Sequence, residues 1–153
     1  MIPVEGPTVL VHNGPGYALY AHSRQRRLTH TCLDVVQPRV KLRGCFPQQG
    51  SPIEVAYFDQ QCGPGPSRLV GVTGGRVAQL NLAVGFRPSR ADRVHLWRIP
   101  GVVGPPGGHA FAIARELAGM AVRLTAYDAA GHRLEQRKLG PFPIAQCVPS
   151  PVR

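Results

Sequence analysis

Residues 122–134 read VRLTAYDAAGHRL, and they lie in the stretch 76–139 that decides the fold. Apolar residues alternate with polar ones up to Tyr127, which is the period of a strand with one buried face. Asp128-Ala129-Ala130-Gly131 then reads as a turn, because Asp suits its first position and Gly accepts a positive φ. Leu134 resumes the apolar pattern beyond the turn. The stretch therefore predicts a β-hairpin.

Short apolar runs of the same kind occur along the rest of the chain. Glycine (18 residues) and proline (16 residues) separate them, as in proteins built from strands and turns. The alanine-rich stretch 110–120 leaves a short helix as the alternative, although Phe111 and Ile113 alternate there and Gly119 ends it early. We predict an all-β chain, an antiparallel sandwich of about nine to eleven strands. The predicted strands are 8–12, 17–22, 28–36, 40–46, 53–58, 68–72, 76–84, 93–98, 109–115, 120–128 and 132–139.

The length of the chain fits one domain. Its 153 residues suffice to bury a single core, and 43% of them are hydrophobic. We predict one β domain over residues 1–153, with an N-terminal arm at 1–7 and an extended, proline-rich tail at 140–153. The loop QQCGPGP at 60–66 is the best candidate for a boundary, but it is too short for a flexible linker between domains. Two subdomain-like halves on either side of it are the lesser alternative.

The cysteines Cys32, Cys45, Cys62 and Cys147 predict two disulfides. No pair has the spacing of a zinc site, and an even set favours an oxidising compartment. Of the three pairings we prefer Cys32–Cys45, which would staple neighbouring strands, with Cys62–Cys147, which would tie the tail to the mid-chain loop. Four free thiols in a cytoplasmic protein are the competing account.

The N-terminus has neither the basic region nor the long apolar segment of a signal peptide. No run reaches the roughly 20 apolar residues that a transmembrane helix needs. With the disulfides, these features lead us to expect an exported protein without a membrane span, in which Met1 begins a trimmed or mature chain.

The net charge of +10 comes almost entirely from arginine, since only Lys41 and Lys138 among the 18 basic residues are lysines. Such a surface attracts phosphate-rich or acidic partners at low salt. Biased base composition of a genome is the alternative origin of the arginines. The candidate anion-binding residues are Arg24, Arg26, Arg27, Arg39, Lys41, Arg43, Arg87, Arg90, Arg93 and Arg98, with Tyr17, Tyr20 and Trp97 as stacking partners.

No constellation in the sequence predicts a reaction. His30, Cys32 and Asp34 share a strand face, but side chains two residues apart lie about 7 Å apart. That separation exceeds the hydrogen-bond reach that a Cys–His pair needs. The histidines have no metal-ligand spacing, and the glycine-rich stretch 101–108 lacks the lysine of a phosphate-binding loop. We expect no catalytic residue, no metal, no cofactor and no small-molecule substrate.

Four motifs in residues 68–139 form one pattern. They are Val70-x-Val72 before a glycine-rich turn, Val77-Ala78-x-Leu80-x-Leu82, Ala110-Phe111-Ala112, and Val122-x-Leu124-x-Ala126-Tyr127-Asp128-Ala129-Ala130-Gly131-x-x-Leu134. This pattern resembles a module from the extracytoplasmic parts of actinobacterial membrane and secreted proteins. The resemblance implies a small immunoglobulin-like (Ig-like) β-sandwich, and it brings no catalytic residues with it.

Together these features predict a non-enzymatic extracytoplasmic protein that acts by self-assembly or surface recognition, as a cell-surface, filament or coat component. Its expected partners are other copies of itself or surface proteins, which the two terminal arms would join by pairing with a sheet edge. The alternative is an anion-binding module for nucleic acid or an anionic wall polymer.

Overall fold

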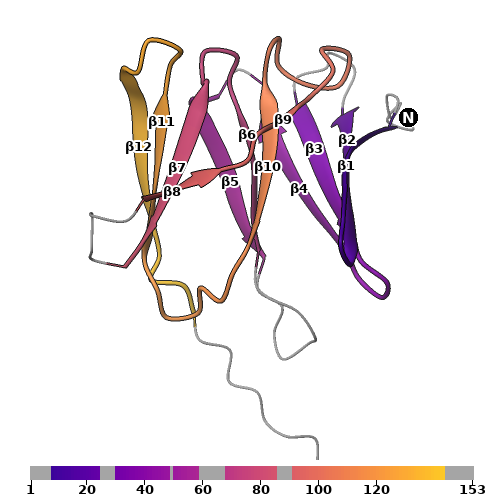
Figure 1. Cartoon of the computed structure of the whole chain (residues 1–153). Coiled ribbons are helices and arrows are strands. Elements are labelled where there is room, and N and C mark those ends of the chain that lie inside the picture. The colour runs from indigo at the N-terminus through magenta and orange to yellow at the C-terminus, as the bar shows by residue number, and fades with distance from the viewer. Residues whose placement is uncertain (1–7, 25–29, 49, 59–67, 86–90, 144–153) are drawn as a thin grey trace, which may run out of the picture.

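The computed structural model is all-β and describes residues 8–24, 30–48, 50–58, 68–85 and 91–143. Twelve strands within these residues form three four-stranded antiparallel sheets (Figure 1). The N-terminal sheet has the order β1-β2-β3-β4, with β1 at Thr8–Gly14, β2 at Tyr17–Arg24, β3 at His30–Val36 and β4 at Lys41–Pro47. The central sheet has the order β5-β6-β10-β9, with β5 at Ile53–Phe58, β6 at Arg68–Thr73, β10 at His109–Ala114 and β9 at Trp97–Arg98. The C-terminal sheet has the order β12-β11-β7-β8, with β12 at Arg133–Leu139, β11 at Val122–Tyr127, β7 at Gln79–Val84 and β8 at Ala91–Val94.

The central sheet lies between the other two, so the described chain has three layers and two cores (Figure 1). Leu69 and Phe111 of the central sheet pack with the C-terminal sheet, whereas Val70 and Ala110 pack with the N-terminal sheet. All six residues of β6 are buried, because its neighbouring side chains alternate between two covered faces. Each fully buried aliphatic side chain contributes about 2 kcal/mol, and β6 therefore stabilises both interfaces at once.

Gly71 allows the close packing at the centre of the molecule. It pairs with Phe111 across β6 and β10, and a Cβ at this position would lie 2.6 Å from Cζ of the Phe111 ring. A side chain at residue 71 would displace that buried ring.

Most of the predicted strands are present, and the hairpin at 128–131 is confirmed. The Asp128 carboxylate oxygen Oδ1 accepts hydrogen bonds from the backbone N–H of Ala130 (3.0 Å) and of His132 (2.8 Å). Gly131 has a φ of 86°, as the turn requires. Residues 109–114 form β10, so the helix alternative is wrong over these residues.

Two sequence predictions need correction. The run 93–98 is not one strand: β8 ends at Val94 and pairs with β7, and β9 begins at Trp97 and pairs with β10. The chain therefore crosses from the C-terminal sheet to the central sheet within two residues. The first turn is also shorter than the four residues 13–16 that separate the predicted strands 8–12 and 17–22, because Gly14 pairs with Tyr17 and leaves Pro15-Gly16 as the loop.

The all-β class and the antiparallel sheets are confirmed, whereas the Ig-like type of sandwich stays a prediction. The preferred disulfide Cys32–Cys45 is present, between residues that face one another on β3 and β4 with their Cα atoms 4.0 Å apart. Cys62 and Cys147 lie outside the described residues, as do residues 1–7 and most of the predicted tail. At the start of that tail, Phe142 is buried and stacks on Tyr57, with ring centroids 4.1 Å apart.

Candidate functional site

The structure separates the predicted anion-binding residues into two places. Lys41 and Arg43 belong to β4 of the N-terminal sheet, and Arg39 precedes them in the β3–β4 connection. Arg93 belongs to β8 and Arg98 to β9, on either side of the crossover between sheets. The remaining predicted residues, Arg26, Arg27, Arg87 and Arg90, lie outside the described part of the chain, as does the side chain of Arg24, the last residue of β2.

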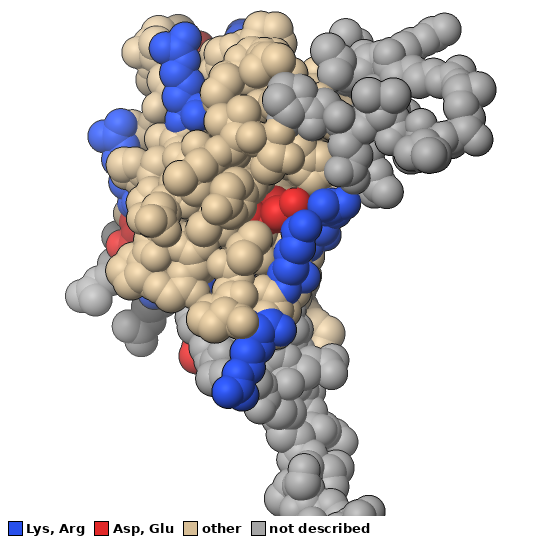
Figure 2. Space-filling view, turned by 90° about the vertical axis from the view of Figure 1, so that its right-hand side faces the viewer, with Lys and Arg blue, Asp and Glu red and all other residues tan. Residues whose placement is uncertain are grey.

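The first place is the outer face of the N-terminal sheet, which points away from the central sheet. Strand pairing aligns its side chains in rows across β1 to β4: Thr8, His22, Cys32 and Cys45; Leu10, Tyr20, Asp34 and Arg43; Asn13, Ala18, Val36 and Lys41. A shallow pocket of about 250 Å³ lies on this face, lined by residues of all four strands. Figure 2 looks onto this side of the molecule, where acidic atoms lie against basic side chains.

Asp34 is the electrostatic centre of the outer face, with only 4% of its surface exposed. Arg43 donates from Nε to Oδ1 (2.7 Å) and from Nη2 to Oδ2 (3.1 Å), and Lys41 Nζ lies 3.5 Å from Oδ2. Burial alone would raise the pKa of Asp34, but the hydrogen bond and charge of Arg43, with the charges of His22 and Lys41, lower it. Lys41 and Arg43 thus both lie against the carboxylate of Asp34, and their role in anion binding stays a prediction.

His22 is a further buried polar residue of this face that sequence reasoning did not single out. It is 2% exposed, its Nδ1 lies 3.6 Å from Asp34 Oδ2, and its buried Nε2 has no hydrogen-bond partner among the described residues. His22 and Asp34 are twelve residues apart and meet only through the β2–β3 register. Periodicity places each residue on a face, but it does not reveal that register.

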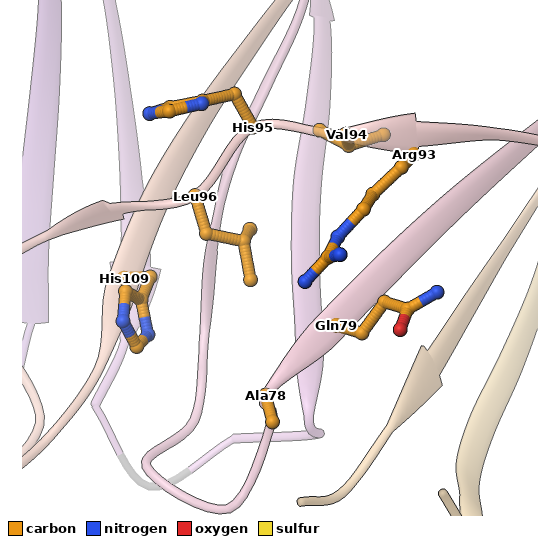
Figure 3. A pocket seen from close by; sticks show the side chains of 7 residues that line it. All are labelled: Ala78, Gln79, Arg93, Val94, His95, Leu96 and His109. Carbon is orange, nitrogen blue, oxygen red and sulfur yellow. The ribbon is translucent and has the colours of Figure 1, made fainter.

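The second place is a pocket at the β8–β9 crossover, with a volume of about 360 Å³ (Figure 3). Its lining comes from β7, β8, β10 and the crossover itself: Ala78, Gln79, Arg93, Val94, His95, Leu96 and His109. Burial, with a smaller contribution from the charge of Arg98, lowers the pKa of His109. The described residues of the pocket wall therefore combine a guanidinium with two imidazoles, and none of them carries a carboxylate.

The predicted stacking residues have different roles in the structure. Trp97 stacks on His12 and Tyr17 lies beside the same imidazole, with ring centroids 4.2 Å and 5.8 Å from it. The Arg68 guanidinium lies over the Tyr17 ring, 4.4 Å from its centroid. Trp97 and Tyr17 are therefore packed within the protein, and only Tyr20 lies on the outer face of the N-terminal sheet.

The sequence grouping of His30, Cys32 and Asp34 does not form a reactive set, because Cys32 is bonded to Cys45. Within the described ranges, no three His, Cys, Asp or Glu side chains are placed to hold a metal ion. The same ranges contain no helix that is long and apolar enough to cross a membrane.

No protein-family model matches the chain, and it matches neither a curated protein nor a solved structure.

Proposed function

We propose that this protein is a non-enzymatic, extracytoplasmic interaction protein that joins other copies of itself through the edge strand β1. It would act as a cell-surface, filament or coat component by self-assembly or surface recognition. The observation that carries the proposal is the uncharged, seven-residue edge that β1 presents, with the sequence TVLVHNG.

The other edges carry features that oppose strand pairing. Of the six edge strands in the described chain, β4, β8 and β12 carry charged residues, and β9 has only two residues. At β5 the backbone N–H of Ile53 donates to Glu135 Oε2 (2.8 Å), and its carbonyl accepts from Arg137 Nη1 (2.9 Å). The first residue of β5 is thus covered by side chains of the C-terminal sheet.

β1 has weaker protection. The strand contains no charged residue and no proline. Its own Leu10 lies on the outer face with 52% of its surface exposed. One bulge at Val11 divides its register into the regular parts 8–10 and 12–14, and in the second part His12 stacks on Trp97 of the central sheet. A pairing strand would therefore add at residues 8–10, where backbone groups are regular and Leu10 supplies apolar contact.

The oxidised Cys32–Cys45 pair is consistent with an oxidising, extracytoplasmic environment. The resemblance of residues 68–139 to actinobacterial extracytoplasmic modules supports the same location. These residues form the C-terminal sheet and three strands of the central sheet, which face one another around one core. We propose that this pair of layers is the Ig-like unit.

The test is size-exclusion chromatography with light scattering at low and high salt. We expect an oligomer that survives high salt, and we expect Leu10→Lys to convert it to a monomer because the new charges repel across the shared edge. Val102→Lys is the matched control, since Val102 is 53% exposed in the β9–β10 connection and lies outside every edge strand. A wild-type monomer at all concentrations, or equal effects of the two substitutions, would rule out the β1 interface.

A second candidate function is the binding of an anionic polymer. It is favoured by Arg39, Arg93 and Arg98, which are exposed and have no carboxylate partner in the described part of the chain. Binding to a polyanion should then weaken steeply as salt rises, because each arginine releases counterions from the polymer. Salt-independent binding, or none, would exclude this candidate.

A further inference from the structure

We infer that the pocket at the β8–β9 crossover is a binding site for a phosphate group, with Arg93 and His109 as its main ligands. The inference names a site for the second candidate function, and it is independent of pairing at β1. It rests on strand register, unpaired buried polar atoms and the charge of the pocket wall.

Strand register places a polar row beside the pocket. Thr73 of β6, His109 of β10 and Arg98 of β9 are direct cross-strand partners, so their side chains share one face of the central sheet. This face is directed at the C-terminal sheet, because Phe111 and Ile113 follow His109 at two-residue intervals and pack there. The polar row of Thr73, His109 and Arg98 therefore lies at the end of the apolar interface between the central and C-terminal sheets, next to the pocket.

Two atoms of this row lack hydrogen-bond partners among the described residues. They are His109 Nδ1 and Thr73 Oγ1, which are both buried and belong to residues that face one another on β10 and β6. A buried polar atom without a partner costs about 1 to 3 kcal/mol. His109 lines the pocket, so a small rotation that opens Nδ1 to the pocket would let its imidazole bind an oxygen atom of a ligand and would remove part of that cost.

The charge of the surroundings is positive and uncompensated. Among the described residues, Arg93 on β8 and His95 on the crossover line the pocket with His109, and the charge of Arg98 on β9 acts on its imidazole. The neighbouring carboxylate of Asp92 is already paired with Arg115 Nη1, at 3.0 Å. An anion in the pocket therefore meets cations without competition from a lining acid.

The lining of the pocket suits a phosphate group that is attached to a larger molecule, either at its end or along its side. In Figure 3 Arg93 extends from β8 toward Ala78 and Gln79, while His109 lies on the other side of Leu96. Leu96 and Val94 give the pocket an apolar part between its cationic residues. Phosphate suits this wall better than a carboxylate, because it can bind Arg93 with one negative charge and favour protonation of His109 with the other.

Phosphate binding should raise the pKa of His109. Burial and Arg98 lower the pKa of His109, so its imidazole is neutral at pH 7 in the free protein. A bound phosphate favours the protonated imidazole and in turn binds more strongly to it.

The test is a titration of the full chain followed by NMR, with inorganic phosphate in one arm and a linear polyphosphate in the other. We expect shifts at His109 and Arg93, and affinity about tenfold lower in Arg93→Gln and in His109→Gln. Arg133→Gln is the matched control, because it removes the same charge from β12 at the opposite edge of the same sheet. Inorganic phosphate that produces these effects identifies a free anion as a sufficient ligand, and effects confined to polyphosphate identify the polymer.

Two outcomes would overturn the site. Equal losses in Arg93→Gln and Arg133→Gln would mean that anions bind the arginine surface diffusely, which rejects the pocket and keeps the second candidate function. Absence of binding in both arms would reject the pocket and the anion-binding candidate together. Arg93 is exposed, so its substitution preserves the fold even where His109→Gln does not.

Discussion

The indole of Trp97 stacks on the imidazole of His12, with ring centroids 4.2 Å apart and 20° between the ring planes. Trp97 lies on β9 at an edge of the central sheet, and His12 lies on β1 at an edge of the N-terminal sheet. The bulge at Val11 makes the contact possible. It shifts the register so that His12 pairs with the inward-facing Leu19, whereas Leu10 pairs with the outward-facing Tyr20.

Removing this stack should loosen β1 from the central layer. We expect Trp97→Ala to lower the free energy of unfolding by about 2 kcal/mol, less than a fully buried Trp because Trp97 is half-buried. In a double-mutant cycle with His12→Ala, urea denaturation should give a coupling energy of about 1 kcal/mol. His95→Ala, which removes an exposed ring tilted against Trp97, is the control with an expected loss below about 0.5 kcal/mol. If the losses of unfolding free energy in Trp97→Ala and His12→Ala add up to the loss in the double variant, the stack contributes nothing to stability.

Asp34 should make the stability of the protein depend on acid pH. Its pKa is lower in the folded state than its ordinary unfolded value of about 3.9. Its contribution is therefore complete above about pH 4 and is lost as pH falls through the folded-state pKa. We expect Asp34→Asn to cost about 2 kcal/mol at pH 7, because the Asn cannot neutralise Arg43 and Lys41, and clearly less at pH 3.

Urea denaturation at both pH values measures this difference. Asp92→Asn is the matched control, since the Asp92–Arg115 pair is exposed and should contribute little at either pH. A cost of Asp34→Asn that is the same at pH 7 and pH 3 would contradict the assigned charge interactions.

Sequence periodicity predicts individual strands well, because alternation depends on a single buried face. The strand 53–58 has its predicted bounds, and the Asp-Ala-Ala-Gly turn forms with the expected glycine conformation. Periodicity fails where one alternating run serves two sheets. Residues 93–98 alternate throughout, yet the pairing partner changes between Val94 and Trp97. Local pattern contains no information on that partner.

The three-layer arrangement and the candidate sites could not be predicted from the sequence, because they depend on which strands pair and in which register. β6 reads RLVGVT, and a continuous apolar run is the available signal that both of its faces are buried. The Asp34–His22 contact and the His109–Arg98 pair join residues at least eleven positions apart, and each exists only once the strand order and register are known. The Cys32–Cys45 pair was predictable because its two strands are consecutive.

The Cys32–Cys45 disulfide should contribute about 3 kcal/mol by restricting a short loop in the unfolded chain, given a sequence separation of 13 residues. We expect Cys32→Ala/Cys45→Ala to lower the stability of the protein by that amount while leaving the far-ultraviolet circular dichroism unchanged. Guanidinium denaturation of the double variant, beside the oxidised wild type, measures the difference. The double variant has no bond between residues 32 and 45 for a reducing agent to break, so it serves as the reference without this disulfide. A loss of stability well below 1 kcal/mol would contradict the expected stabilisation by restriction of the unfolded chain.

Arg68 is 6% exposed and its guanidinium lies over the Tyr17 ring, and its Nε and Nη1 atoms are buried without hydrogen-bond partners in the part of the chain that the structure describes. Burial lowers the pKa of Arg68, which reflects the cost of holding its charge away from water. Because the methylene stem is buried while no described carboxylate pairs with the charge, Arg68→Met should leave the free energy of unfolding unchanged or raise it by up to about 2 kcal/mol. Arg68→Lys, which keeps the charge but loses the planar contact with Tyr17, should destabilise the protein in the same denaturation assay. Destabilisation by Met as large as that by Lys would show that the guanidinium contact outweighs its burial cost.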